Sequence, residues 1–230
     1  MDGSSTSHVS AVAALDEPTR RRLYDFVARR PAPVSRDEAA DALGMSRSTV
    51  VFHLDRLANE GLLEVVYERR TGRTGPGAGR PSKLYRRAAE QIAVSLPDRR
   101  YELAGRLLAT AIQEAGDTGE APRRVVDRLA RELGGDIGQA ARDAHPDEDG
   151  RDAAMRTLED FGFEPRDEEG AIVLGNCPFH TLAQQHTELV CGMNLCLLGG
   201  ILDGLTATGL TARLDPDPGR CCVRLEAPPR

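Results

Sequence analysis

The sequence predicts a mainly α-helical α+β protein with small sheets, divided into two domains. Apolar residues at helical spacing dominate the chain, and short extended segments occur in both halves. Charge also separates the halves: residues 1–97 carry 15 basic and 12 acidic side chains, whereas residues 98–230 carry 15 and 24. We therefore expect a disordered tail over 1–10, a basic domain over 11–97 and an acidic domain over 98–230.

Composition narrows the class of protein further. The chain has 230 residues, 40% hydrophobic and 29% charged, as in globular proteins that bury a core. Neither a signal peptide nor an apolar run of membrane-spanning length is recognisable, so we expect a cytoplasmic protein with no membrane partner. The five cysteines all lie beyond position 176, and in a reducing compartment they indicate metal ligands or redox thiols rather than disulfides.

The first domain contains an ordered set of helix signals. Asp16-Glu17-Pro18 predicts a helix start, and Ser35-Arg36-Asp37-Glu38 forms a capping box for a short helix that stops at Gly44. Ser46 caps the next helix, whose buried stripe consists of Val50, Leu54 and Leu57. Two helices joined by a tight turn, the second amphipathic, are typical of a helix-turn-helix.

A basic hairpin follows these helices. Leu62–Tyr67 predicts a strand, Glu68–Gly79 a glycine-rich loop, and Arg80–Tyr85 a returning extended segment. Residues 66–87 hold seven basic side chains and one acidic side chain, Glu68. The hairpin therefore predicts a wing, and the whole domain a winged helix-turn-helix.

The motifs of this domain resemble those of ArsR/MarR-type winged-helix regulators. The resemblance rests on Ser46-Arg47-Ser48-Thr49-Val50, on Glu60-Gly61-Leu62-Leu63 and on the Gly79–Tyr85 wing segment. It implies binding to double-stranded DNA. The recognition helix is expected to present Arg47, Ser48, Thr49, Phe52 and His53 to the major groove. The wing is expected to bring Arg69, Arg70, Arg73, Arg80 and Lys83 to phosphates or the minor groove.

The second domain has a different pattern. Helices are expected over Tyr101–Ala115, Pro122–Arg142, Ala153–Phe161 and Ala183–Leu205, with Ile112 on the apolar face of the first. Extended segments are expected at 163–165, Ala171–Leu174, Thr211–Leu214 and Cys221–Glu226. This arrangement predicts a small α+β domain.

The cysteine spacing excludes a zinc ribbon. Thirteen residues separate Cys177 from Cys191, and 29 or 30 more precede the pair Cys221 and Cys222. Cys196 lies about 140° around its helix from Cys191, so we interpret it as a small buried hydrophobe. Neighbouring residues on a strand point to opposite faces, so only one of Cys221 and Cys222 is expected to be a ligand.

These segments resemble the cysteine-containing sensor domain of SufR-type repressors, winged-helix homodimers that bind an iron–sulfur cluster and control genes of cluster assembly. The resemblance is carried by Asn176-Cys177-Pro178-Phe179, Leu189–Asn194, 200–205 and Leu214–Cys222. It implies a [4Fe-4S] or [2Fe-2S] cluster on Cys177, Cys191 and one of Cys221 and Cys222. A fourth ligand would be His180, His186, a carboxylate or a small molecule. It also implies a repressor that reads a palindromic operator as a homodimer, with dimer contacts around 101–115 and 183–205.

Three alternatives stay open at this point. The cysteines could be free structural thiols, or the regulator could respond to zinc, haem or a small organic effector. A third alternative is an enzyme that uses Cys177 as a nucleophile with His180 or His186 as its base. No oxyanion-hole motif, phosphate loop or acidic pair accompanies that pair in the sequence. We therefore expect a regulator without enzymatic activity.

Overall fold

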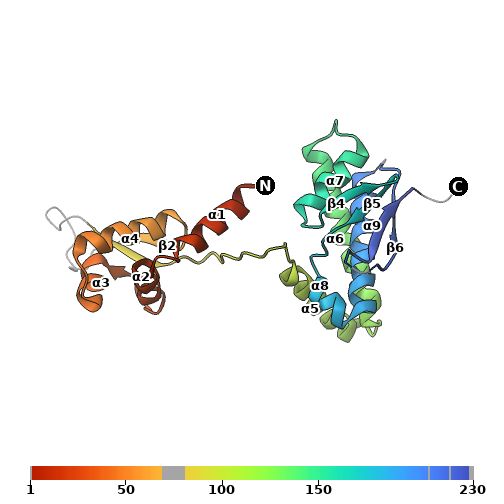
Figure 1. Cartoon of the computed structure of the whole chain (residues 1–230). Helices are drawn as coiled ribbons and strands as arrows, with labels where there is room; N and C mark the ends of the chain where they lie inside the picture. Colours follow the sequence, from red (N-terminus) through yellow and green to blue (C-terminus); the bar gives the residue numbers. More distant parts are fainter. Residues whose placement is uncertain (1, 69–80, 207, 218, 228–230) are drawn as a thin grey trace. The chain divides into compact units, whose positions relative to one another are not determined.

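The computed structural model of the chain describes residues 2–68, 81–206, 208–217 and 219–227 (Figure 1). The chain divides into two compact units, Met1–Val94 and Ser95–Arg230. Both combine helices with a small antiparallel sheet, which confirms the predicted α+β class. The second unit begins three residues before the boundary expected from sequence.

In its described residues, 2–68 and 81–94, the first unit has four helices and a three-stranded sheet. Its helices are α1 (Asp2–Ala14), α2 (Pro18–Ala28), α3 (Arg36–Leu43) and α4 (Arg47–Asn59). Its strands are β1 (Val34–Ser35), β2 (Leu63–Glu68) and β3 (Ser82–Arg87), in the order β1-β3-β2. The strands β2 and β3 pair antiparallel from Leu63 opposite Arg87 to Glu68 opposite Ser82, which forms the base of the wing.

Local capping sets the ends of these helices as predicted. The Ser35 hydroxyl accepts from the Glu38 amide while the Glu38 carboxylate accepts from the Ser35 amide, which completes the capping box of α3. Gly44 ends α3 with a left-handed φ of 65°, a conformation that favours glycine. Ser46 caps α4 through the amide of Thr49. These contacts fix the turn between the two helices.

The structure has a helix where a disordered tail over 1–10 was expected. Residues 2–14 form α1, and Ala11 and Ala14 at its end are buried in the first core. Two small apolar side chains one turn apart let the helix pack closely against its neighbours. Ala11 and Ala14 lie just after residues 1–10, so the composition of that segment did not reveal their burial.

The part of the second unit that the structure describes contains five helices and a four-stranded sheet. Its helices are α5 (Tyr101–Thr118), α6 (Pro122–Ala144), α7 (Gly150–Asp160), α8 (His180–Gln185) and α9 (Thr187–Leu205). Its strands are β4 (Pro165–Glu168), β5 (Ala171–Leu174), β6 (Thr211–Leu214) and β7 (Val223–Glu226), in the order β4-β5-β7-β6. Leucines and valines of α6, α9 and the sheet form the core of this unit.

Glycines allow α6 and α9 to pack backbone against backbone. A Cβ atom added to Gly134 would lie 2.1 Å from the Leu197 carbonyl oxygen, and one on Gly138 would lie 2.2 Å from that of Ile201. On the facing helix, a Cβ atom added to Gly200 would lie 2.1 Å from the Arg131 carbonyl oxygen, and one on Gly204 would lie 2.3 Å from that of Gly135. This contact holds α9, which carries Cys191, in a fixed position.

The structure corrects three predicted elements of the second unit. The predicted helix 183–205 begins earlier and is broken at His186, where ψ is 53°, so α8 and α9 are separate helices. Ile112 of α5 is 67% exposed, because Ala104, Leu107 and Ala111 form the buried face instead. Strand β7 begins at Val223, so the two cysteines before it are not strand residues.

Among the described residues, α9 is the helix long and apolar enough to cross a membrane by length and composition. Ten of its residues are buried in the second unit, including Val190, Met193, Leu197 and Ile201. Packing against α6 accounts for this apolar character, as in the core helix of a globular domain.

Candidate functional sites

The outer surface of α4 is a shallow, partly basic hollow. Of the residues predicted to face DNA, Arg47, Ser48, Thr49 and Phe52 are exposed, and the Phe52 side chain is 66% exposed. Sequence reasoning missed several further residues that line this hollow: Arg36, Val51, Asp55, Arg56 and Asn59. They fall one, two and three turns along α4 from Ser48, or at the start of α3.

His53 does not belong to this exposed surface. Its side chain is 13% exposed and its Nδ1 atom lies 3.7 Å from a carboxylate oxygen of Glu17, the residue that caps α2. His53 was expected among the outward-facing residues of this helix. Its neighbour Leu54 is fully buried, however, and the side chain lies at the edge of the core stripe. We therefore remove His53 from the predicted base-reading residues.

The basic residues of this surface are neutralised by carboxylates in the free protein. Arg47 Nε lies 3.0 Å from Asp37, and Lys83 Nζ lies 2.6 Å from Asp55. Asp55 also accepts a 2.6 Å hydrogen bond from the hydroxyl of the buried Tyr85. Burial, the largest single influence, would raise the pKa of Asp55, but the hydrogen bonds from Lys83 and Tyr85 and the charge of Lys83 together outweigh it and lower the pKa. Binding of a phosphate to Lys83 therefore has to compete with Asp55.

The other predicted wing contacts lie outside the described residues. Arg69, Arg70, Arg73 and Arg80 belong to the segment 69–80. Lys83 is the wing residue that the structure places, on β3 beside α4. The base of the wing and the recognition helix are thus joined through Asp55.

The second unit brings four cysteine side chains together. Cys221 is the largest influence on the pKa of Cys177, and Cys222 influences the pKa of both Cys221 and Cys191, so the four side chains lie near one another. Three of the thiols are buried and Cys222 is half-buried. The premise that Cys221 and Cys222 alternate along a strand is wrong, because both precede β7 and lie in the chain segment that leads into it.

The pKa values of Cys177, Cys191 and Cys221 are raised, which favours the protonated thiol. The hydrogen bond with Cys221 and then burial raise the pKa of Cys177 strongly. For Cys221, the bond with Cys177 lowers the pKa, but the bond with Cys222 and burial together raise it to about 12. Burial also raises the pKa of Cys191. A thiol in this state is a poor nucleophile, which weighs against the enzyme alternative based on Cys177.

Asn194 completes the inner wall of this cysteine site. Its side chain is 1% exposed, and Nδ2 donates a 3.2 Å hydrogen bond to the Cys221 sulfur. Its other polar atom, Oδ1, is buried without a hydrogen-bond partner in the described structure. An unpaired buried carbonyl oxygen is costly, and its position beside the thiols marks a polar site inside an apolar core.

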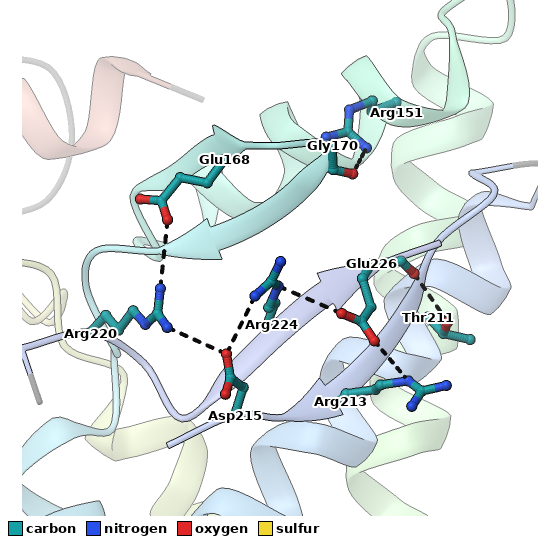
Figure 2. Close-up of polar contacts among 9 residues, drawn as sticks. All are labelled: Arg151, Glu168, Gly170, Thr211, Arg213, Asp215, Arg220, Arg224 and Glu226. Atoms are coloured by element: carbon teal, nitrogen blue, oxygen red, sulfur yellow. Dashed lines mark hydrogen bonds and ion pairs between the residues drawn. The ribbon is translucent and has the colours of Figure 1, made fainter. Parts of the chain in front are cut away.

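The segment that carries Cys221 and Cys222 is fixed by backbone and charge contacts. The Cys221 amide donates to the Leu174 carbonyl at 2.9 Å, and the Cys222 carbonyl accepts from the Asp215 amide at 2.8 Å. Arg220 contacts Glu168 and Asp215, as Figure 2 shows. These contacts tie the segment to both hairpins of the sheet.

Cys196 takes no part in this cysteine site. It is half-buried, and the charged groups that affect it are Asp127 and Arg131 rather than the other cysteines. Among the described residues, no three or more His, Cys, Asp or Glu side chains are grouped so as to hold a metal ion as they stand.

The comparisons with known proteins bear on the first unit. Residues 15–66 match a family described as a helix-turn-helix domain. This range runs from the residues before α2 to the middle of β2, and includes the whole of α3 and α4. No curated protein and no solved structure matches the chain. Together with the exposed, partly basic recognition helix, the match defines a DNA-binding transcription regulator of the helix-turn-helix class.

Proposed function

We propose that this regulator is a homodimeric repressor whose affinity for DNA is set by an iron–sulfur cluster bound to Cys177, Cys191, Cys221 and Cys222. The observation that carries the proposal is the convergence of these four side chains from a loop, a helix and the segment before β7. Thiolate sulfur is the usual protein ligand of such clusters. Cys222 takes the place of the fourth ligand that sequence reasoning sought among His180, His186 and other groups.

The surroundings of the four thiols also fit such a group. The unpaired Asn194 Oδ1 and the apolar core around it provide a polar but water-poor site. The Asn194 amide donates to sulfur, and such hydrogen bonds tune the reduction potential of a cluster. When bound, an iron–sulfur cluster would supply a redox-responsive centre. The chain's own residues would supply the four thiolates.

We place the dimer contact on α5. Its outer face carries the exposed Ile112 and the half-buried Leu108, whereas α9 is occupied by its packing against α6. A second copy of this chain would cover the α5 face. Two recognition helices related by a twofold axis would then read a palindromic operator with half-sites about one helical turn, roughly 34 Å, apart. The variant Ile112→Glu should shift the protein towards monomer in light scattering.

The test of the cluster is a set of single variants purified without oxygen. Cys177→Ser, Cys191→Ser, Cys221→Ser and Cys222→Ser should each lower iron and sulfide content and the visible absorption. Cys196→Ser, on the same helix as Cys191, is the matched control and should bind like the wild type. A colourless wild-type protein that lacks iron yet binds DNA normally contradicts the proposal.

Zinc is the second candidate, because four thiolates are also a common zinc ligand set. Metal analysis of the same samples separates the two. About one zinc per chain, lost in the four variants and kept in Cys196→Ser, would assign the site to zinc. In that case the protein would be colourless and would carry no sulfide.

A further inference from the structure

The residue before Cys177 is bonded to the chain entry of the second unit. Asn176 is 6% exposed, and its Nδ2 donates to the carbonyls of Gly162 at 2.5 Å and Asp98 at 3.1 Å. Its Oδ1 accepts a 2.6 Å hydrogen bond from Arg99 Nη1. Two of these three bonds reach residues nearly eighty positions away in sequence. We call Asp98, Arg99 and Asn176 the latch.

Neighbouring residues reinforce the latch. The Arg100 amide donates to the Pro178 carbonyl at 3.0 Å, and its guanidinium donates to the Asp160 carbonyl at 2.8 Å. The Tyr101 hydroxyl donates to Thr181 Oγ1 at 2.9 Å. Consecutive residues from 98 to 101 thus contact the loop 175–179 that carries Cys177 (the Cys177 loop), the end of α7 or the start of α8. The entry segment is held as one unit with the loop.

The approach of the entry segment to Gly162 leaves no room for adjustment. Gly162 has a φ of +83°, and a Cβ atom at this position would lie 2.5 Å from the Cβ of Asp98. Movement of the Cys177 loop through Asn176 must therefore either carry residues 98–100 with it or break the hydrogen bonds of the latch. Packed contacts of this kind transmit displacement rather than absorb it.

The latch lies directly after the connection between the two units. The first unit ends at Val94, and only Ser95–Pro97 separate it from Asp98. We propose that Arg99 and Asn176 are positioning residues that transmit the ligation state of Cys177 to the chain segment leading to the helix-turn-helix domain. This inference rests on the proposed function of the cysteine site. It adds the residues through which that site acts on DNA binding.

The test compares the DNA affinity of two forms of each variant. The full-length protein is prepared metal-free and after anaerobic reconstitution with ferrous iron and sulfide. Dissociation constants are measured on a duplex selected from a random-sequence pool. In the wild type the two constants should differ by about 5- to 150-fold, the usual range of coupling between sites. In Arg99→Gln the ratio should fall to within about twofold of one, with unchanged iron content and melting temperature.

Two further variants complete the design. Asn176→Ala should also bring the ratio of the two dissociation constants close to one. Arg99→Lys, which keeps a donor and the charge, should retain part of the wild-type ratio. Arg106→Gln, an exposed arginine on α5, is the matched control and should keep the wild-type ratio. A folded Arg99→Gln protein with the full wild-type ratio overturns the latch alone. Equal affinities of the two wild-type forms overturn the proposed function and the latch with it.

Discussion

Arg47, the first residue of the recognition helix, forms an ion pair with Asp37 of the preceding helix, with 3.0 Å between Nε and Oδ1. The pair lacks the alignment of a hydrogen bond, and both side chains are substantially exposed. Such a pair is weak and is easily replaced by a phosphate. The free protein therefore keeps a DNA-binding arginine in place with a contact that DNA can displace.

Removing the Asp37 charge should tighten DNA binding. In Asp37→Asn the phosphate no longer competes with a carboxylate for Arg47, and the expected gain is about 1.4- to fivefold, which corresponds to about 0.2–1 kcal/mol for an exposed pair. Fluorescence anisotropy with a labelled duplex measures it. Asp41→Asn, on the exposed side of the same helix, is the control. An equal gain in both variants would mean that general charge, not release of Arg47, is responsible.

Phe52 should contribute directly to DNA binding. A phenylalanine that is 66% exposed on a recognition helix is suited to contact a thymine methyl group in the major groove. Its burial there contributes about 1.5 kcal/mol or more, so Phe52→Ala should weaken binding roughly tenfold. The melting temperature should not change. Leu214→Ala, another exposed apolar residue but in the second unit, should leave the affinity unchanged.

Glu17 should make stability depend on pH in a defined window. Its carboxylate accepts hydrogen bonds from the amides of Thr19 at 2.9 Å and Arg20 at 2.7 Å. The bond from the Thr19 amide is the largest influence and lowers the pKa of Glu17 from 4.5 to about 2. A depressed pKa stabilises the fold above pH 4.5, and this contribution is lost as the pH falls towards 2.

Thermal unfolding between pH 2 and 6 tests this behaviour. The wild type should exceed Glu17→Gln in melting temperature by the largest margin above pH 5, with the margin closing near pH 2. Asp16→Asn is the control, because it removes a negative charge one residue earlier and leaves the helix cap of Glu17 in place. A margin that stays constant with pH would show that the Glu17 carboxylate does not act through its charge.

The glycine contact between α6 and α9 should tolerate no side chain. The Cβ of Gly138→Ala would lie 2.2 Å from the Ile201 carbonyl oxygen, so the helices must separate, at a cost of about 3 kcal/mol or more. Gly135→Ala is the matched control, since its Cβ would meet nothing within 4 Å. That change should stabilise α6 by about 0.5–1 kcal/mol. Denaturant titration distinguishes the two variants.

Local signals predicted the first unit well. The capping box at Ser35, the left-handed turn at Gly44 and the cap at Ser46 each depend on residues within a few positions, and the structure has all three. His53 was misplaced because helical spacing does not specify where the edge of a core stripe lies. Ile112 was misplaced for a different reason. The face of α5 that is buried in the second unit consists mainly of alanines, and not of its largest apolar side chains.

The cysteine site was predictable in its members but not in its geometry. The strand rule separated Cys221 from Cys222, but that rule applies only within a strand, and β7 starts at Val223. The latch had no local signal at all. Asn176 and Arg99 are far apart in sequence, and their contact depends on how α5, α7 and the Cys177 loop pack. Such contacts can be found only once the fold is known.

The half-buried position of Cys222 also sets an order of events in the metal-free protein. An oxidant that diffuses in from solvent meets Cys222 before the three buried thiols. Cys222 is also the thiol that influences the pKa of both Cys221 and Cys191. Oxidation of this single sulfur would therefore separate Cys191 on α9 from Cys221 and Cys177. The most accessible cysteine is thus the one that is expected to be oxidised first.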